Sequence, residues 1–226
     1  MKLTWELARR VRRVIAVEKD EQLIEKLAAN IQKERIQNVT LIAGDILTGL
    51  YRSKIGTESK QKYKVVANIP YYLTSRLIRL LLEADPLPET IIFTIQKEVA
   101  QRIIAKPPKM NLLALSVQAL SKPKIIKTVP AECFYPKPKV ESSIILLSDI
   151  SDKFFKNNKI DQKYFFSILK LAFSQKRKLL TNTLKNIADK GRLEFLLESA
   201  GLKKTARPQE VSLKQWLDII TKLEKT

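Results

Sequence analysis

The sequence predicts an α/β fold, in which a mostly parallel sheet is wrapped by helices, followed by a helical C-terminal region. Up to about residue 148, short apolar runs of strand length alternate with segments of helical periodicity, which is typical of βα units and parallel sheets. From about residue 149, the apolar residues follow only a helical period. We therefore expect two domains, residues 1–148 and residues 149–226, the second of them all-helical.

The elements of the first domain follow from the apolar periodicity of each segment. Strands are expected at 13–18, 38–45, 64–68, 89–96, 124–130 and 140–148, and helices at 20–34, 74–84, 97–105 and 111–121. Asp20 and Thr74 have the side chains that cap helix starts, so each is expected to cap the helix at its position. Residues 52–62 are rich in Lys, Ser, Gly and Thr and predict a loop.

Three helical segments are expected in the second domain. They span residues 163–188, 192–201 and 212–224. Gly201 stands at the end of the second segment, where a glycine commonly stops a helix.

The charge of the chain predicts a polyanionic partner. The 226 residues contain 42 Lys+Arg and 23 Asp+Glu, which gives a formal charge of +19. Nucleic acid is the first candidate for this partner and an anionic membrane surface the second. No apolar run reaches the length of a membrane span, and arginines at positions 10, 12 and 13 stand where a signal peptide would be apolar. We expect a soluble cytoplasmic protein.

The numbers of cysteine and histidine residues limit the chemistry that the chain can perform. The chain has one cysteine, Cys133, and no histidine. A disulfide within the chain and a histidine-dependent triad are therefore excluded, and the composition argues against a zinc site. We expect no metal.

Three successive predicted strands end in polar residues, namely Glu18, Asp45 and Asn68. Ligands of open parallel sheets bind beyond the carboxyl ends of the strands. A carboxylate after such a strand can hold ribose hydroxyls, and a second one can accept from the exocyclic amine of adenine. The alternative is that strand ends lie at the surface and are polar for that reason alone.

The stretch NIPYY begins at Asn68 and combines an amide, a proline and aromatic rings. Pro70 has no N–H and a fixed φ, so it can hold the Ile69 carbonyl outward. The Asn68 amide oxygen and the Ile69 carbonyl oxygen would then form a pair of acceptors for an NH₂ group, on whose ring Tyr71 can stack. An Asx or proline turn with no ligand is the competing interpretation.

With these residues the sequence resembles the ribosomal RNA adenine N6,N6-dimethyltransferases of the KsgA type. The resemblance runs in order through VIAVEKD, LIAGDIL, NIPYY, TIQKEVAQRI, FYPKPKVESSIILL and AFSQKRKLLTNTL. Lys176 replaces the first arginine of the family's last motif. Erythromycin-resistance methylases share the Asn-Pro motif but fit FSQKRK less well, and adenine-N6 DNA methylases usually have proline where Ile69 stands.

The resemblance implies a Rossmann-like class I methyltransferase sheet and S-adenosylmethionine as the methyl donor. It implies transfer of methyl groups to N6 of two adjacent adenosines near the 3′ end of small-subunit rRNA, during ribosome biogenesis. The implied catalytic residues are Asn68, Ile69, Pro70, Tyr71 and Phe134, with Tyr71 and Phe134 on opposite faces of the flipped adenine. The implied donor-binding residues are Glu18, Lys19, Asp45, Ile46 and Asn68. The expected partner is small-subunit rRNA or an immature small ribosomal subunit, bound by a monomer.

The C-terminal domain is expected to bind RNA through Lys176, Arg177 and Lys178. Lys97 and Arg102 of the first domain are further candidates for RNA contacts. Most charge runs are simply solvated surfaces, and we assign that interpretation to the other basic residues of the C-terminal domain.

One family feature is absent from the sequence. The donor site of the family begins with an acid–Gly-x-Gly-x-Gly loop after the first strand, yet no glycine precedes Gly44 here. The resemblance therefore implies a sheet that lacks its first strand and has an open edge. One hypothesis is a truncated form of an active enzyme, and the intact downstream motifs favour it. The alternative is a catalytically inactive rRNA-binding protein or fragment that has lost donor binding.

Overall fold

A computed structural model describes residues 2–48, 62–175 and 177–224. The chain divides into two compact units: Met1–Tyr63 with Tyr72–Pro88, and Lys64–Tyr71 with Glu89–Thr226. Lys176 and all but the last residue of the loop predicted at 52–62 lie outside the described residues.

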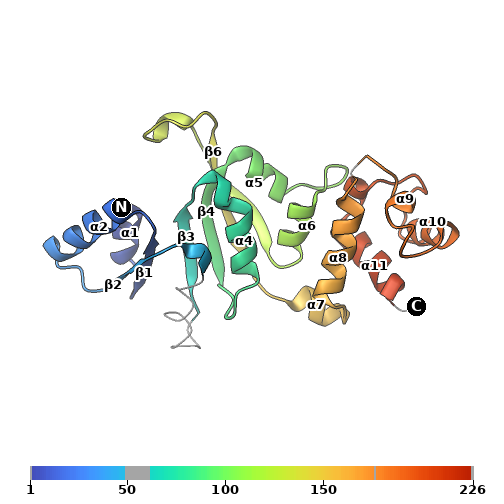
Figure 1. Cartoon of the computed structure of the whole chain (residues 1–226), viewed down its shortest axis with the longest axis horizontal. Helices are drawn as coiled ribbons and strands as arrows, with labels where there is room; N and C mark the ends of the chain where they lie inside the picture. Colours follow the sequence, from blue (N-terminus) through green and yellow to red (C-terminus); the bar gives the residue numbers. More distant parts are fainter. Residues whose placement is uncertain (1, 49–61, 176, 225–226) are drawn as a thin grey trace. The chain divides into compact units, whose positions relative to one another are not determined.

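The first unit contains a parallel strand pair, and Figure 1 shows the first two helices of the chain beside this pair. Its elements are α1 (Lys2–Ala8), β1 (Val14–Glu18), α2 (Glu21–Lys33), β2 (Val39–Ala43), the 3₁₀ turn η1 (Ile46–Thr48) and α4 (Thr74–Leu82). β1 and β2 pair in parallel from Val14 opposite Val39 to Glu18 opposite Ala43. Among the described strands β1 pairs only with β2.

One of the two predicted helix caps is confirmed. The Asp20 carboxylate accepts a hydrogen bond from the Leu23 N–H at 3.1 Å and caps α2. The prediction for Thr74 is wrong, because Thr74 is already the first residue of α4 and Leu73 is its N-cap, without a side-chain hydrogen bond. The 3₁₀ turn η2 (Tyr71–Leu73) leads directly into the helix. Leu73 therefore has helical dihedral angles rather than the extended ones of a capping residue.

The second unit is built on a four-stranded sheet in the order β3-β4-β6-β5. Its strands are β3 (Lys64–Asn68), β4 (Thr90–Gln96), β5 (Lys122–Val129) and β6 (Ser142–Ser148). β3 and β4 are parallel, whereas β6 runs antiparallel to both β4 and β5. The expectation of a mostly parallel sheet therefore does not extend to the late strands. β5 and β6 follow each other without a crossover helix, and such neighbours pair antiparallel.

The core of this sheet centres on β4. Its side chains alternate between buried and half-buried, and Ile91, Phe93 and Ile95 are fully buried. Helices α5 (Lys97–Ile103) and α6 (Leu112–Gln118) contact the sheet. Asn111 caps α6 by accepting a hydrogen bond from the Ala114 N–H at 3.0 Å.

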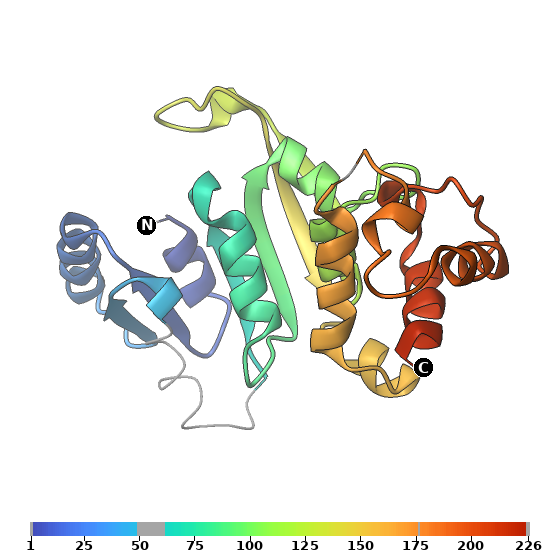
Figure 2. The same cartoon turned by 45° about the vertical axis from the view of Figure 1, so that its right-hand side comes forward.

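The C-terminal part of this unit is helical, as predicted (Figure 2). Its helices are α7 (Lys153–Asn158), α8 (Gln162–Phe173), α9 (Leu180–Thr183), α10 (Lys190–Ser199) and α11 (Leu213–Glu224). The single helix predicted at 163–188 is wrong, because the chain turns between α8 and α9. At that turn the Ser174 hydroxyl donates to the Leu171 carbonyl at 2.7 Å, a local bond that competes with helix continuation. Leu179 is extended.

Gly201 ends α10, as the sequence predicts. Its φ is +72°, in the left-handed region that favours glycine. The N–H groups of Gly201 and Leu202 donate to the carbonyls of Glu198 and Leu197, each at 2.9 Å. This is the hydrogen-bond pattern of a Schellman motif.

The C-terminal helices and the four-stranded sheet belong to the same compact unit. Helix α6 contacts α8, and the Met110 N–H donates to the Gln209 carbonyl at 3.0 Å. The domain boundary at residues 148 and 149 stays a prediction. No helix in the described part of the chain is long and apolar enough to cross a membrane.

Candidate active site

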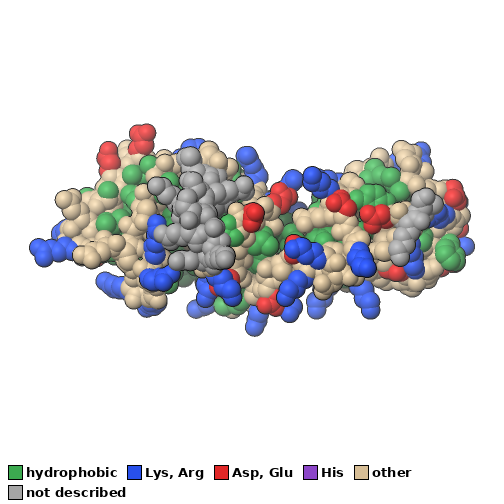
Figure 3. Space-filling view, turned by 90° about the horizontal axis from the view of Figure 1, so that it is seen from below, with side chains coloured by type: hydrophobic (Ala, Val, Ile, Leu, Met, Phe, Trp, Pro, Cys, Tyr) green, Lys and Arg blue, Asp and Glu red, His purple; other side chains and the backbone are tan. Residues whose placement is uncertain are grey.

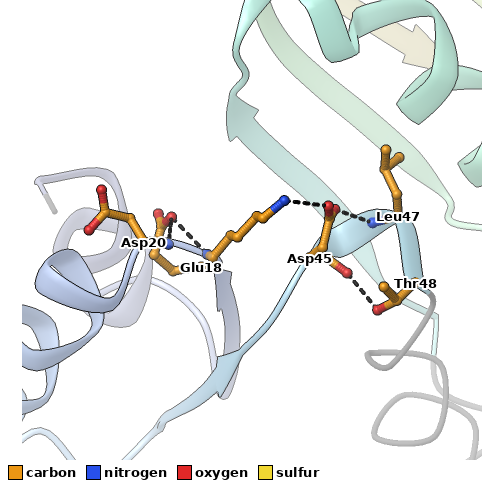
Figure 4. A network of polar contacts seen from close by, with 6 residues as sticks. Glu18, Asp20, Asp45, Leu47 and Thr48 are labelled. Carbon is orange, nitrogen blue, oxygen red and sulfur yellow. Dashed lines mark hydrogen bonds and ion pairs between the residues drawn. The ribbon is translucent and has the colours of Figure 1, made fainter.

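Glu18 is the last residue of β1 and is held by the turn that follows it. Its Oε1 accepts hydrogen bonds from the backbone N–H groups of Lys19, at 2.8 Å, and Asp20, at 3.0 Å (Figure 4). Within the described ranges, its second oxygen, Oε2, has no hydrogen-bond partner. The turn therefore holds the carboxylate in place and leaves one oxygen available to a ligand.

Asp45 lies two residues beyond β2, whose end is paired with the end of β1. Its Oδ1 accepts from the Leu47 N–H at 2.9 Å, and its Oδ2 pairs with the Lys19 ammonium at 3.2 Å (Figure 4). The hydrogen bond from Leu47, and after it that from Lys19, lowers the pKa of Asp45 below its ordinary value. Asp45 is therefore ionised at neutral pH and can act only as an acceptor.

Lys19 and Ile46 were predicted to bind the donor on the strength of the resemblance. The Lys19 side chain is 76% exposed and its ammonium lies on Asp45. Ile46 opens η1 and is half-buried. The first unit thus brings together Glu18, Lys19, Asp45 and Ile46 around the ends of β1 and β2.

Asn68 is the last residue of β3 and its side chain is exposed. It lies opposite Thr94 in the parallel ladder with β4. Its side chain forms no hydrogen bond with any other described residue. Ile69 is only 7% exposed, so its buried side chain anchors the turn beside an available amide, while Pro70 is exposed.

Tyr71 follows this turn, and its ring is half-buried. Its hydroxyl shares a hydrogen bond with the hydroxyl of Ser142 at 3.0 Å. Ser142 is the first residue of β6 and is fully buried. The sequence reasoning missed Ser142. The available signal was a pair of serines at the start of an otherwise apolar strand, in VESSIILL.

Phe134 lies on the connection between β5 and β6, directly after the 3₁₀ turn η3 (Ala131–Cys133). Figure 1 shows this connection extending beyond the end of the sheet. The Phe134 N–H donates to the Ala131 carbonyl at 3.2 Å, and its ring is half-buried. The next residue, Tyr135, is fully exposed.

The residues predicted to contact RNA differ in exposure and in whether their charge is already paired. The Lys97 ammonium pairs with the Glu141 carboxylate at 2.7 Å. Arg102 is exposed near the end of α5. Arg177 and Lys178 are exposed in the turn between α8 and α9, and the Lys178 N–H donates to the Gln175 carbonyl at 2.9 Å.

Basic side chains are widely distributed outside these candidates. Lys and Arg project from many points of the face shown in Figure 3. The interpretation of most of them as solvated surface stays a prediction. In the described part of the chain, no group of three or more Cys, Asp or Glu residues is arranged to hold a metal ion.

Comparison with known protein families gives a match over nearly the whole chain. A family model described as "Ribosomal RNA adenine dimethylase" matches residues 1–225. Among curated proteins, "Ribosomal RNA small subunit methyltransferase A" of Dehalococcoides mccartyi (strain CBDB1) is 36% identical, over 95% of this chain and 72% of that protein. The protein of the same name from Nostoc sp. (strain PCC 7120) is 37% identical, over 96% of this chain and 82% of its own length.

Two solved structures share the fold. A dimethyladenosine transferase from Plasmodium falciparum superposes with a TM-score of 0.81 at 23% identity, covering 99% of this chain and 86% of that one. The 23S rRNA methyltransferase ErmE superposes with a TM-score of 0.76 at 25% identity, covering 98% and 86%. These likenesses confirm the predicted Rossmann-like methyltransferase fold with a helical C-terminal part.

Proposed function

Because this chain belongs to the ribosomal RNA adenine dimethylase family, we propose that its Asn68–Tyr71 segment holds an rRNA adenine while the N6 amine is methylated. The chain is an S-adenosylmethionine-dependent methyltransferase that dimethylates adenine in rRNA. The target we propose is two adjacent adenosines near the 3′ end of small-subunit rRNA. The observation that carries the proposal is the exposed Asn68 amide at the end of β3, beside the buried Ile69.

The chemistry requires alignment more than a strong base. The N6 lone pair of adenine is delocalised into the ring and is a weak nucleophile. S-adenosylmethionine, when bound, supplies an electrophilic methyl group on its sulfonium sulfur. Holding the amine in line with that group can lower the barrier by several kcal/mol, with an upper range of roughly 7–11 kcal/mol.

Asn68 and Ile69 supply this alignment in the proposal. The Asn68 amide oxygen and the Ile69 carbonyl oxygen accept the two N–H bonds of the amine and so fix its orientation. The same acceptors stabilise the positive charge that develops on nitrogen in the transition state. The alkylated nitrogen is acidic, so water can take its proton, and the absence of histidine from the chain is compatible with this step.

The side chains around β1 and β2 fit a nucleoside with a positively charged group. The Oε2 of Glu18, to which no described residue donates a hydrogen bond, can accept from ribose hydroxyls. The ionised Asp45 can accept from the exocyclic amine of the donor's adenine, and Ile46 offers an apolar side chain beside it. The Lys19 ammonium forms an ion pair with the Asp45 carboxylate. A ligand that binds to Asp45 would therefore require the Lys19 side chain to move.

The target base must leave its helical stack, which costs a few kcal/mol. Stacking on aromatic side chains returns roughly 1–3 kcal/mol per base. In the proposal Tyr71 stacks on one face of the adenine and Phe134 on the other. Arg102, Arg177 and Lys178, which are exposed, bind phosphates.

Lys97 and Lys176 take different places in the proposal. Lys97 contributes less to RNA binding than the exposed basic residues because Glu141 neutralises it. Lys176 remains a candidate from the sequence. We further propose that the protein is a cytoplasmic monomer and that it acts on an immature small ribosomal subunit.

The substitution Asn68→Ala tests the role of the amide. We expect it to abolish transfer of tritium-labelled methyl groups to small ribosomal subunits that lack the modification. Binding of the rRNA should stay nearly unchanged, because phosphate contacts supply most of the affinity. Asn157→Ala is the matched control, since Asn157 is exposed on α7. Normal transfer by the Asn68→Ala variant would refute the proposed site.

The alternative of an inactive rRNA-binding protein is not favoured by the family match. It predicts rRNA binding without calorimetric heat on titration with S-adenosylmethionine. The proposed function predicts saturable donor binding that weakens when Glu18 is replaced by alanine. Digestion of the methylated rRNA and mass spectrometry of its nucleosides identify N6,N6-dimethyladenosine as the product.

A further inference from the structure

The hydrogen bond between Tyr71 and Ser142 joins two segments that are far apart in the sequence. The two hydroxyl oxygens lie 3.0 Å apart and the residues are 71 positions apart. Tyr71 opens η2, directly after the Asn68 turn, and Ser142 opens β6, directly after the connection that carries Phe134. One bond therefore links the segments that carry both proposed stacking rings.

Ser142 is a rigid point of attachment. It lies between two strands, opposite Gln96 of β4 and opposite Val129 of β5. It is fully buried. The preceding residue, Glu141, is held as well, because its carbonyl accepts from the Lys97 N–H at 3.0 Å. The position of the Ser142 hydroxyl is thus set by the sheet.

The neighbouring Ser143 provides a comparison within the same strand. Ser143 is equally buried, yet its hydroxyl has no hydrogen-bond partner among the described residues. Burial of a serine at the start of β6 does not by itself bring a side-chain partner. The Tyr71 hydroxyl is a specific partner of the Ser142 position.

We propose that Ser142 is a positioning residue that fixes the direction of the Tyr71 ring axis for stacking on the target adenine. This inference rests on the proposed function. A phenol attached only through its Cβ can swing about that end, whereas one whose distant hydroxyl is also bonded has the long axis of its ring fixed at both ends. A ring whose long axis is held at both ends gives the flipped adenine a defined place to stack during methyl transfer. It also keeps the base in the geometry that transfer requires.

Ser142→Ala and Tyr71→Phe each remove the bond and keep the ring. We expect each to lower kcat for methyl transfer by about threefold to tenfold, the equivalent of one net hydrogen bond. KM for the rRNA substrate should change by less than about twofold, since phosphate contacts dominate binding. The double variant should be no slower than either single variant, because both changes remove the same interaction.

Ser143→Ala is the matched control, with the same substitution on the same strand, and its kcat and KM should equal those of the unaltered protein. A kcat for Ser142→Ala equal to that of Ser143→Ala would overturn the inference, as would losses that multiply in the double variant. If Ser142→Ala fails to fold, Tyr71→Phe decides alone, and an unchanged kcat then refutes the inference.

The Asn68→Ala variant separates this inference from the proposed function. Activity that survives Asn68→Ala refutes the proposed function. An inactive Asn68→Ala variant together with a fully active Ser142→Ala variant refutes only the role of Ser142.

Discussion

Asp45 shows how local and distant contacts together set the state of one side chain. The nearer contact is its hydrogen bond from Leu47, two residues away. The other is Lys19, 26 residues away along the chain. Resemblance alone assigned Lys19 to the donor site, whereas its observed contact is with Asp45, which it helps to keep ionised.

The pKa of Asp45 should therefore lie below the ordinary aspartate value of about 3.9. Lys19→Ala should raise it only part of the way, because the Leu47 hydrogen bond, the larger cause, remains. The folded-state pKa is lowered, so the resulting stabilisation is present above the ordinary pKa and is lost as the pH falls through the folded-state value. An NMR titration of the Asp45 carboxyl carbon measures both values.

Lys26→Ala is the control for this titration. Lys26 is exposed on α2, so its removal changes the net charge by the same amount without touching Asp45. An Asp45 pKa that Lys19→Ala leaves unchanged would contradict the ion pair.

At the scale of the element, the two glycines of α10 and its C-terminus have opposite roles. Gly201 has a φ of +72°, and the Cβ of an alanine at this position would have no other atom within 4 Å. Only the backbone conformation therefore opposes an alanine there. Gly191 is the second residue of α10, where alanine has the higher helix propensity. A Cβ there would meet the Asp189 carboxylate oxygen at 3.4 Å, an ordinary contact.

Gly201→Ala should reduce the free energy of unfolding by about 1 kcal/mol, the cost of a left-handed alanine. Gly191→Ala should increase it by about 0.5–1 kcal/mol. Chemical denaturation of both variants measures the difference between two identical substitutions at the two ends of one helix. Equal effects of the two would show that the Schellman turn does not depend on glycine.

At the scale of the whole molecule, the charge of +19 is expected to act through a few phosphate contacts. Arg177→Ala combined with Lys178→Ala should weaken rRNA binding. It should also reduce the slope of log K against log salt by about 2, one for each lost contact. Binding measured over a range of potassium chloride concentrations gives the slope.

Lys163→Ala combined with Lys214→Ala is the control pair, since both residues are exposed on helices of the same unit. This pair also removes two positive charges, but from positions that are not predicted to contact RNA. If both pairs lower the slope equally, binding follows net charge and the turn between α8 and α9 has no special role.

Features that depend on neighbouring residues could be predicted from the sequence alone. The strands and most helices follow from apolar periodicity, the start of α2 from Asp20, and the end of α10 from Gly201. The order of the motifs determined the family, and with it the exposed amide at the end of β3.

Contacts between segments that are distant in the sequence could not be predicted and are set by the assembled fold. The bond from Tyr71 to Ser142, the ion pair of Lys97 with Glu141 and the antiparallel direction of β6 all depend on strand order and register. Periodicity reports which face of an element is buried, but not which element lies against it. Side chains that carry the same local signal, such as Ser142 and Ser143, therefore acquire different partners only when the sheet is assembled.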